Sequence, residues 1–226
     1  MDIIQEVNEE LKRENFHQLW NKYGRYVIGC AVGVVLFTAL YTAWQNYSHT
    51  KNQQEAQQYA AAYDLAEAGD KDAALQAMAK VADSADSGYR ALARLNQAGL
   101  LIGMGKKEDA VGVYRALAAD TKVDPIFRDI GRVYAAMHMV DTAPRPEIDA
   151  LLAPVNNDTN PWRHSAREIL AIAAYQDKDL TTARDLLGKL STDATAPQKM
   201  RDRATKMLDV LSEDAPATTK ESAGNS

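Results

Sequence analysis

The chain has 226 residues, of which 46% are hydrophobic, 25% charged and 7% aromatic, with one cysteine and a formal net charge of −5. This composition excludes a collagen-like protein, a disulfide-stapled domain and a mostly disordered chain, and the length allows one domain or two small ones. The mean hydropathy of −0.39 is that of an ordinary soluble protein. That average conceals one segment, because residues 26–50 contain no Asp, Glu, Lys or Arg.

Residues 1–25 are predicted to form a short amphipathic arm. Ile4, Val7 and Leu11 lie on one stripe of a helix, and acidic residues surround them. Such a helix can lie on a membrane or dock on a partner. The acidic residues disfavour anionic lipid, so we expect docking or plain solvation.

Residues 26–47 are predicted to cross a membrane. The apolar run from Tyr26 to Trp44 has nineteen residues, which at about 1.5 Å per residue makes roughly 28 Å of helix, close to the about 30 Å of a bilayer core. Aromatic side chains flank the run at both ends, as expected among lipid headgroups. A buried core helix and a cleaved signal peptide are the alternatives. The long run, the acidic leading segment and the absence of a small-residue cleavage pattern favour a retained anchor.

Basic residues near the span predict its orientation. Four precede it and one follows within twenty positions: Lys12, Arg13, Lys22 and Arg25 before, and Lys51 after. This bias places the N-terminus in the cytoplasm and residues 48–226 on the other side. Within the span, Gly29 and Gly33 form a G-x-x-x-G pair, which predicts a contact with a second membrane helix.

Residues 48–211 are predicted to form an all-α domain of helical repeats. Alanine is abundant, and no stretch alternates apolar and polar residues with a period of two. Gly105 lies 36 residues after Gly69, and Ala110 lies 36 residues after Ala74. A third copy centres on Ala183, which lies 73 residues beyond Ala110, close to two further periods.

This spacing predicts about four helix pairs, with the third pair over residues 125–139 and 146–154 and a capping helix over residues 197–211. A small residue at the turn, an alanine five positions later and a large apolar residue four beyond that resemble the tetratricopeptide repeat. A generic alanine-rich helical bundle is the alternative. Residues 212–226 contain no large apolar side chain and are predicted to be a disordered tail.

Motifs for catalysis or metal binding do not stand out. The four histidines are scattered without a second ligand at helical spacing, and the single cysteine, Cys30, lies within the span. After residue 47 there are 22 basic against 26 acidic residues, which disfavours nucleic-acid binding. We therefore expect no enzymatic activity, no cofactor, no metal and no small-molecule substrate. An envelope enzyme with an unrecognised site is the alternative from another class.

The first helices of the repeats are predicted to line a groove that binds protein segments. Tyrosines suit such a groove because they bury much area and lose little rotamer freedom. The alternative is that these side chains pack between repeats. The candidate groove residues are Tyr59, Tyr63, Glu67, Leu95, Asn96, Arg132, Glu168 and Tyr175.

The segment from Glu6 to Asn15 and the segment from Leu19 to Gly24, with the single span and alanine-rich repeats, resemble a known family. It comprises membrane-anchored tetratricopeptide-like proteins of Gram-negative bacteria related to the ancillary subunit of the Sec translocon. The resemblance implies an inner-membrane anchor, a periplasmic repeat domain, and partners among the Sec translocon, periplasmic chaperones and exported polypeptides. It implies a non-enzymatic adaptor. A scaffold for cell division, cytochrome maturation or outer-membrane assembly is the alternative.

Overall fold

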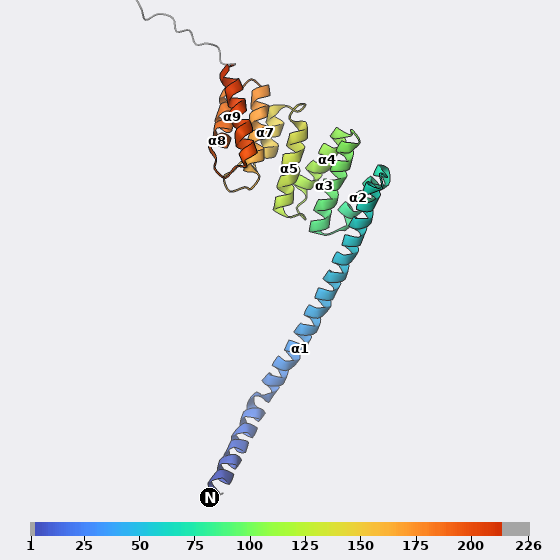
Figure 1. Cartoon of the computed structure of the whole chain (residues 1–226). Helices are drawn as coiled ribbons and strands as arrows, with labels where there is room; N and C mark the ends of the chain where they lie inside the picture. The colour runs from blue at the N-terminus through green and yellow to red at the C-terminus, as the bar shows by residue number, and fades with distance from the viewer. Residues whose placement is uncertain (1–2, 214–226) are drawn as a thin grey trace, which may run out of the picture. The chain divides into compact units, whose positions relative to one another are not determined.

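The computed structural model describes residues 3–213 (Figure 1), all of whose regular elements are helices. Spatial contacts divide the chain into two units, residues 1–54 and residues 55–226, which are described separately. Helix α1 covers Ile3–Glu67 and so contributes residues to both units. Most of the predicted tail, from residue 214 on, lies outside the described residues, as do the side chains of residues 1–21 that carry the predicted amphipathic stripe.

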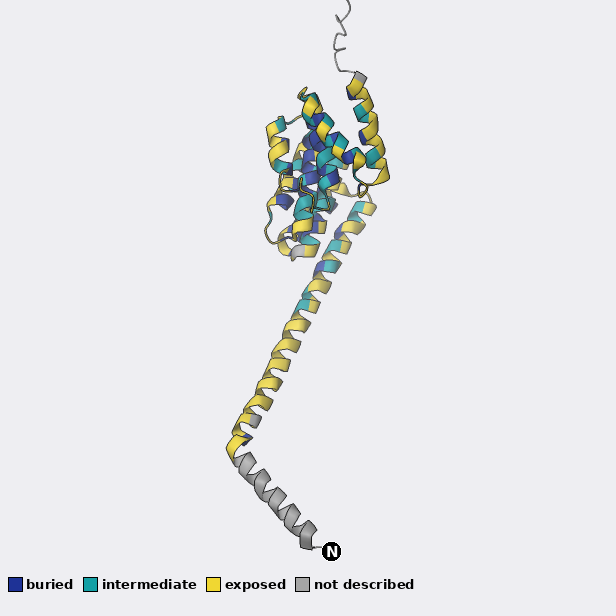
Figure 2. Ribbon diagram, turned by 90° about the vertical axis from the view of Figure 1, so that its left-hand side faces the viewer, coloured by how far each residue is buried: buried dark blue, intermediate teal, exposed yellow. Residues whose placement is uncertain are grey.

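In the first unit, α1 is long and apolar enough to cross a membrane. Phe37 and Leu40 are each 71% exposed, and the ribbon in Figure 2 is coloured as exposed along almost all of the described part of this segment of α1. The hydroxyls of Thr38 and Thr42 donate to the carbonyls of Val34 and Thr38, at 2.8 Å each. Polar groups bonded within their own helix are compatible with an apolar surround.

The second unit is a stack of helix pairs in chain order, as Figure 1 shows from α2 to α9. The end of α1 pairs with α2 in repeat one, and three more pairs and a final helix follow. This confirms the predicted all-α architecture of four helix pairs plus a capping helix. The bounds are α2 Lys71–Ser84, α3 Ser87–Gly103, α4 Lys107–Ala119, α5 Pro125–Met139, α6 Arg145–Leu152, α7 Arg163–Gln176, α8 Leu180–Thr192 and α9 Gln198–Glu213.

Three of the turns within pairs have the same geometry. Gly69, Gly105 and Lys178 adopt φ values of +85°, +75° and +62°, in the left-handed region. In each turn this residue donates to the carbonyl three positions back, and the next residue donates to the carbonyl five positions back, at 2.9 to 3.1 Å. This is the Schellman motif, which satisfies the last carbonyls of a helix and reverses the chain. The repeated glycines found in the sequence therefore have a conformational cause.

Alanines and one glycine let the helices approach closely. Ala74, Ala110 and Ala183, the alanines of the repeat pattern, are fully buried. At Gly131 on α5, an added Cβ would lie 2.8 Å from the carbonyl oxygen of Tyr114 on α4. The α4–α5 crossing thus brings a helix onto the backbone of its neighbour.

Polar contacts join each repeat to the next. Arg145 donates to Asp179 at 2.8 Å, Arg115 on α4 binds Glu147 on α6, and Lys71 donates to the carbonyl of Gly103 at 3.4 Å. Their partners lie 32 to 34 residues apart, about one repeat. Hydrogen bonds from Thr182 and from Arg145 lower the pKa of Asp179 from 3.8 to about 2. Such neighbour-to-neighbour contacts are what a linear repeat array requires.

Candidate protein-binding surface

One side of the first helices carries most of the predicted groove residues. Five residues follow one another at intervals of 35 to 37 positions, one from each of the four first helices and one from the capping helix, and therefore form a row across the stack. They are Tyr59, Leu95, Arg132, Glu168 and Arg203. We call the side of these helices marked by this row the first-helix face. The first four are predicted groove residues, and Arg203 on the capping helix continues the row.

At the N-terminal end of this face, Tyr59 joins the first two repeats. Its hydroxyl accepts a hydrogen bond from Nδ2 of Asn96 at 2.7 Å, and its ring lies 5.7 Å from that of Tyr89. Burial is the main cause of the raised pKa of Tyr59. Beside this pair, Tyr63 is 44% exposed and Leu92 is 36% exposed. Tyr59 and Asn96 thus have a packing role, while Tyr63 and Leu92 offer apolar surface.

In the middle of the face the side chains are held by the protein itself. Leu95 is partly buried and packs against two clusters of the hydrophobic core. Arg132 forms an ion pair with Asp129 at 2.8 Å, and the other oxygen of Asp129 accepts from Asn160 at 2.8 Å. These contacts order the surface locally. A role for Leu95 or Arg132 in binding stays a prediction.

Toward the C-terminal end, α7 and α9 contribute matching side chains. Both oxygens of Glu168 accept hydrogen bonds from Arg203, at 2.7 and 2.8 Å. Tyr175 lies seven residues after Glu168, and Val210 lies seven after Arg203, so each lies two turns along the same side of its helix. Glu168 is therefore already paired within the protein, whereas Tyr175 is 39% exposed.

An apolar pocket opens where Tyr175 meets the capping helix. It has a volume of about 270 Å³ and is lined by five residues. These are Tyr175, Lys206, Met207, Val210 and Leu211, which we call the α9 pocket. Sequence analysis missed Lys206 and Val210. Val210 is an apolar residue outside the apolar stripe of the capping helix, and this position is the sequence signal that could have indicated the pocket.

The remaining predicted residues lie elsewhere. Glu67 is exposed in the last turn of α1. Gly29 and Gly33 lie in the first unit, where an added Cβ would meet nothing within 4 Å among the described residues. Their surface is free for a helix contact, and this contact stays a prediction.

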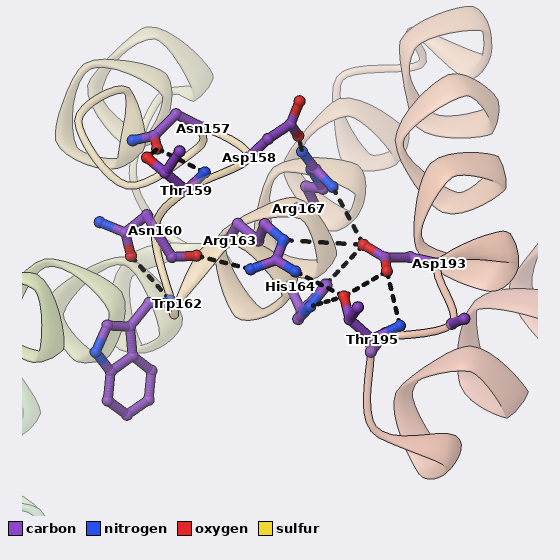
Figure 3. Close-up of polar contacts among 12 residues, drawn as sticks. Asn157, Asp158, Thr159, Asn160, Trp162, Arg163, His164, Arg167, Asp193 and Thr195 are labelled. Carbon is purple, nitrogen blue, oxygen red and sulfur yellow. Dashed lines mark hydrogen bonds and ion pairs between the residues drawn. The ribbon is translucent and has the colours of Figure 1, made fainter.

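A polar cluster absent from the sequence-based predictions lies between α7 and the loop that precedes α9 (Figure 3). In Figure 3 the side chains of Arg163, His164 and Arg167 point toward the carboxylate of Asp193, at 3.8, 3.6 and 3.8 Å. Asp193 also accepts hydrogen bonds from the backbone and hydroxyl of Thr195. We call these five residues the Asp193 cluster. The hydrogen bonds from Thr195 lower the pKa of Asp193.

The Asp193 cluster places a hydroxyl, an imidazole and a carboxylate in sequence, which is the order of groups in a nucleophilic triad. Its hydrogen bonds run differently. The Thr195 hydroxyl donates to Asp193 at 2.5 Å and lies 3.4 Å from Nε2 of His164, which is only 7% exposed. Among the described residues, Nδ1 of His164 has no hydrogen bond and lies 3.6 Å from Asp193, so the carboxylate does not orient the imidazole as it does in a triad. The contacts instead hold α7 against the loop that precedes the capping helix.

The arrangement defines a class of protein, an all-helical array of repeated helix pairs. A family model described as the tetratricopeptide repeat-like domain matches residues 17–144, more than half of the chain. The chain belongs to this family. No curated protein and no solved structure matches it. The match includes the apolar part of α1 and ends before α6, so α7 and α9 extend the repeat beyond the matched region.

Fold and family together indicate a protein-interaction adaptor. Repeat domains of this type are typically non-catalytic scaffolds that bind other proteins. Within residues 22–213, no group of three or more His, Cys, Asp and Glu side chains is placed to hold a metal ion. The first-helix face is the candidate surface for a partner, and a binding role for this face stays a prediction.

Proposed function

We propose that the protein is a membrane-tethered periplasmic adaptor that acts as an ancillary subunit of the Sec translocon and brings periplasmic chaperones to exported polypeptides. The observation that carries the tether is the exposed apolar part of α1. Phe37 and Leu40 are each 71% exposed among the residues whose side chains the structure describes, and lipid supplies the apolar surround that such side chains need. The basic residues before the span favour a cytoplasmic N-terminus and a periplasmic repeat domain.

The binding role rests on the first-helix face. Tyr63 and Leu92 are exposed beside the ordered Tyr59–Asn96 pair, so a partner meets apolar side chains on a rigid base. Exposed apolar groups on a preorganised surface are typical of protein-binding sites. Tethering beside a membrane channel raises the local concentration of the adaptor, so that weak individual contacts suffice.

Site-specific crosslinking in living cells tests this function. A photoreactive amino acid replaces Tyr63 or Leu92 in the full-length chain, and captured proteins are identified by mass spectrometry. The control position is Met137, which is 45% exposed and lies about 140° around α5 from Arg132. We expect translocon subunits or periplasmic chaperones at positions 63 and 92 and not at 137. Capture of components of cell division, cytochrome maturation or outer-membrane assembly supports the alternative scaffold instead.

A further inference from the structure

The capping helix α9 ends the stack with a charged outer side. Glu168 of α7 contacts Arg203 of α9, 35 positions later, which sets the register between the two helices. At this offset, α7 positions that are buried or half-buried correspond to exposed charged residues on α9. The pairs are His164 and Lys199, Arg167 and Asp202, Ala171 and Lys206, and Ala174 and Asp209. A solenoid needs such a polar outer side on its last repeat to stay soluble.

The α9 pocket is therefore not a surface left open for the packing of a further repeat helix. The side of α9 where a further helix would pack is charged, while the side that faces Tyr175 stays apolar and open. Val210 is 52% exposed there, and Leu211 forms buried floor. The volume of about 270 Å³ lies below the range of about 300–1,000 Å³ typical of small-molecule sites. It suits one or two apolar side chains of a polypeptide.

Two polar groups stand at the rim without partners. Among the described residues, neither the ammonium group of Lys206 nor the hydroxyl of Tyr175 has a hydrogen bond or an ion pair. Lys206 lies one helical turn before Val210, a distance of about 6 Å between Cβ atoms. The pocket thus combines an apolar floor with a cation and a hydroxyl donor, which complement a carboxylate.

We propose that the α9 pocket binds an acidic, apolar segment of a partner polypeptide. This inference rests on the proposed adaptor function and assigns it a second contact point. A large apolar side chain enters between Tyr175, Met207 and Val210, and a carboxylate about one helical turn away pairs with Lys206. Because Glu168 and Tyr175 share one side of α7, a segment bound here continues the first-helix face.

A membrane surface and the chain's own C-terminal segment fit less well. The outer charges of α9 alternate in sign, with Lys199 and Lys206 beside Asp202 and Asp209, so they create no positive patch for anionic lipid. Residues 214–226 contain no apolar side chain larger than Ala or Pro. That segment therefore cannot fill the pocket with a large apolar group.

The test uses full-length protein in detergent micelles and an array of twelve-residue peptides. Each probe carries one Leu or Phe with an Asp or Glu three or four residues away in an alanine and serine background, and a matched set carries Lys instead of the acid. We expect the wild type to prefer the acidic set. Val210→Glu should weaken this binding about tenfold or more, as at an interface hot spot, and Lys206→Glu should shift the preference to the Lys set. Met137→Glu is the control and should bind like the wild type.

Equal binding of both peptide sets, or unchanged binding by Val210→Glu, would overturn the inference. Two further results would assign the pocket another occupant and would also overturn it. These are a dimer of the chain that Val210→Glu dissociates, and binding of anionic vesicles that Lys206→Glu abolishes. Thermal unfolding by circular dichroism shows whether each variant is folded, and the reversed preference of Lys206→Glu does not depend on Val210→Glu. Crosslinking separates the two proposals. Capture from Tyr63 but not from Val210 leaves the adaptor function standing and refutes the α9 pocket, whereas capture from neither refutes the adaptor.

Discussion

At the scale of single residues, the three Schellman turns share one backbone conformation but differ in the residues that adopt it. Gly69 and Gly105 occupy the left-handed position at no steric cost, whereas Lys178 adopts the same conformation in the fourth repeat. The residue after the left-handed position, which precedes the next helix, is aspartate in two of the turns and lysine in the third. The side chains of Asp70 and Asp179 accept hydrogen bonds from Ala73 and Thr182 and so cap their helices.

Replacing Lys106 with aspartate should stabilise the second repeat. Lys106 precedes α4 with φ and ψ of −90° and 63°, close to the values of Asp70 and Asp179, but it makes no side-chain capping bond. A carboxylate there can accept from an amide of the first turn, which typically contributes about 1 kcal/mol. Urea unfolding of the full-length protein in detergent measures the effect. Asp70→Ala removes the corresponding cap of α2 and should lower stability by a similar amount. An unchanged unfolding midpoint for Lys106→Asp would contradict the expected capping bond at this position.

The Asp193 cluster should make stability depend on pH. Burial and the positive charge of Arg163 lower the pKa of His164 below 6.5, despite the opposing effect of Asp193. The unfolded chain therefore binds a proton more readily than the folded one, so stability is highest above about pH 7.5 and decreases as the pH falls through 6.5.

Unfolding midpoints between pH 8 and pH 5.5 test this dependence. His164→Gln should flatten the slope, because the variant has no proton to take up. Burial also lowers the pKa of His138, so His138→Gln should remove a further part of the loss of stability at low pH. Equal slopes in the wild type and both variants would show that neither imidazole is kept neutral by the fold.

At the scale of elements, the α4–α5 crossing depends on Gly131. An added methyl group would lie 2.8 Å from the carbonyl oxygen of Tyr114 and 3.0 Å from the amide nitrogen of Ala118, and backbone atoms cannot move aside cheaply. Gly131→Ala should therefore destabilise the protein by about 1–3 kcal/mol, the usual cost of overpacking.

Gly112→Ala is the control for that substitution. Gly112 lies on α4 with nothing within 4 Å of an added Cβ. Alanine there should stabilise the helix by up to about 1 kcal/mol through its higher helix propensity. If both variants change stability in the same direction, helix propensity rather than the close approach at Gly131 decides the outcome.

The sequence was sufficient for the repeat architecture and insufficient for the surface. The 36-residue spacing of Gly69 and Gly105 reflects a turn that needs positive φ, and buried Ala74 and Ala110 follow from close helix crossings, so local rules revealed both. Glu168 was predicted to face a groove, but its partner Arg203 lies 35 residues away. Such a pairing depends on how helices stack, which no local pattern encodes. The Asp193 cluster was missed for the same reason.

At the scale of the whole molecule, an exposed apolar helix and a repeat domain share one chain. The tether and the binding surface serve one function only if the repeats lie on the side of the membrane where the partners are. The proposed cytoplasmic N-terminus and periplasmic repeat domain are therefore the central claim, and every proposed partner depends on them.

Cysteine labelling in intact cells tests this claim most directly. Cys30 is the only cysteine, so Cys30→Ala gives a background in which a single cysteine can be placed at Asn8 or at Lys122 in the exposed loop after α4. A thiol reagent that cannot cross the inner membrane should label Lys122→Cys in intact cells and Asn8→Cys only after the membrane is permeabilised. Labelling of Asn8→Cys in intact cells, with Lys122→Cys protected until permeabilisation, would contradict the proposed topology and the periplasmic adaptor with it.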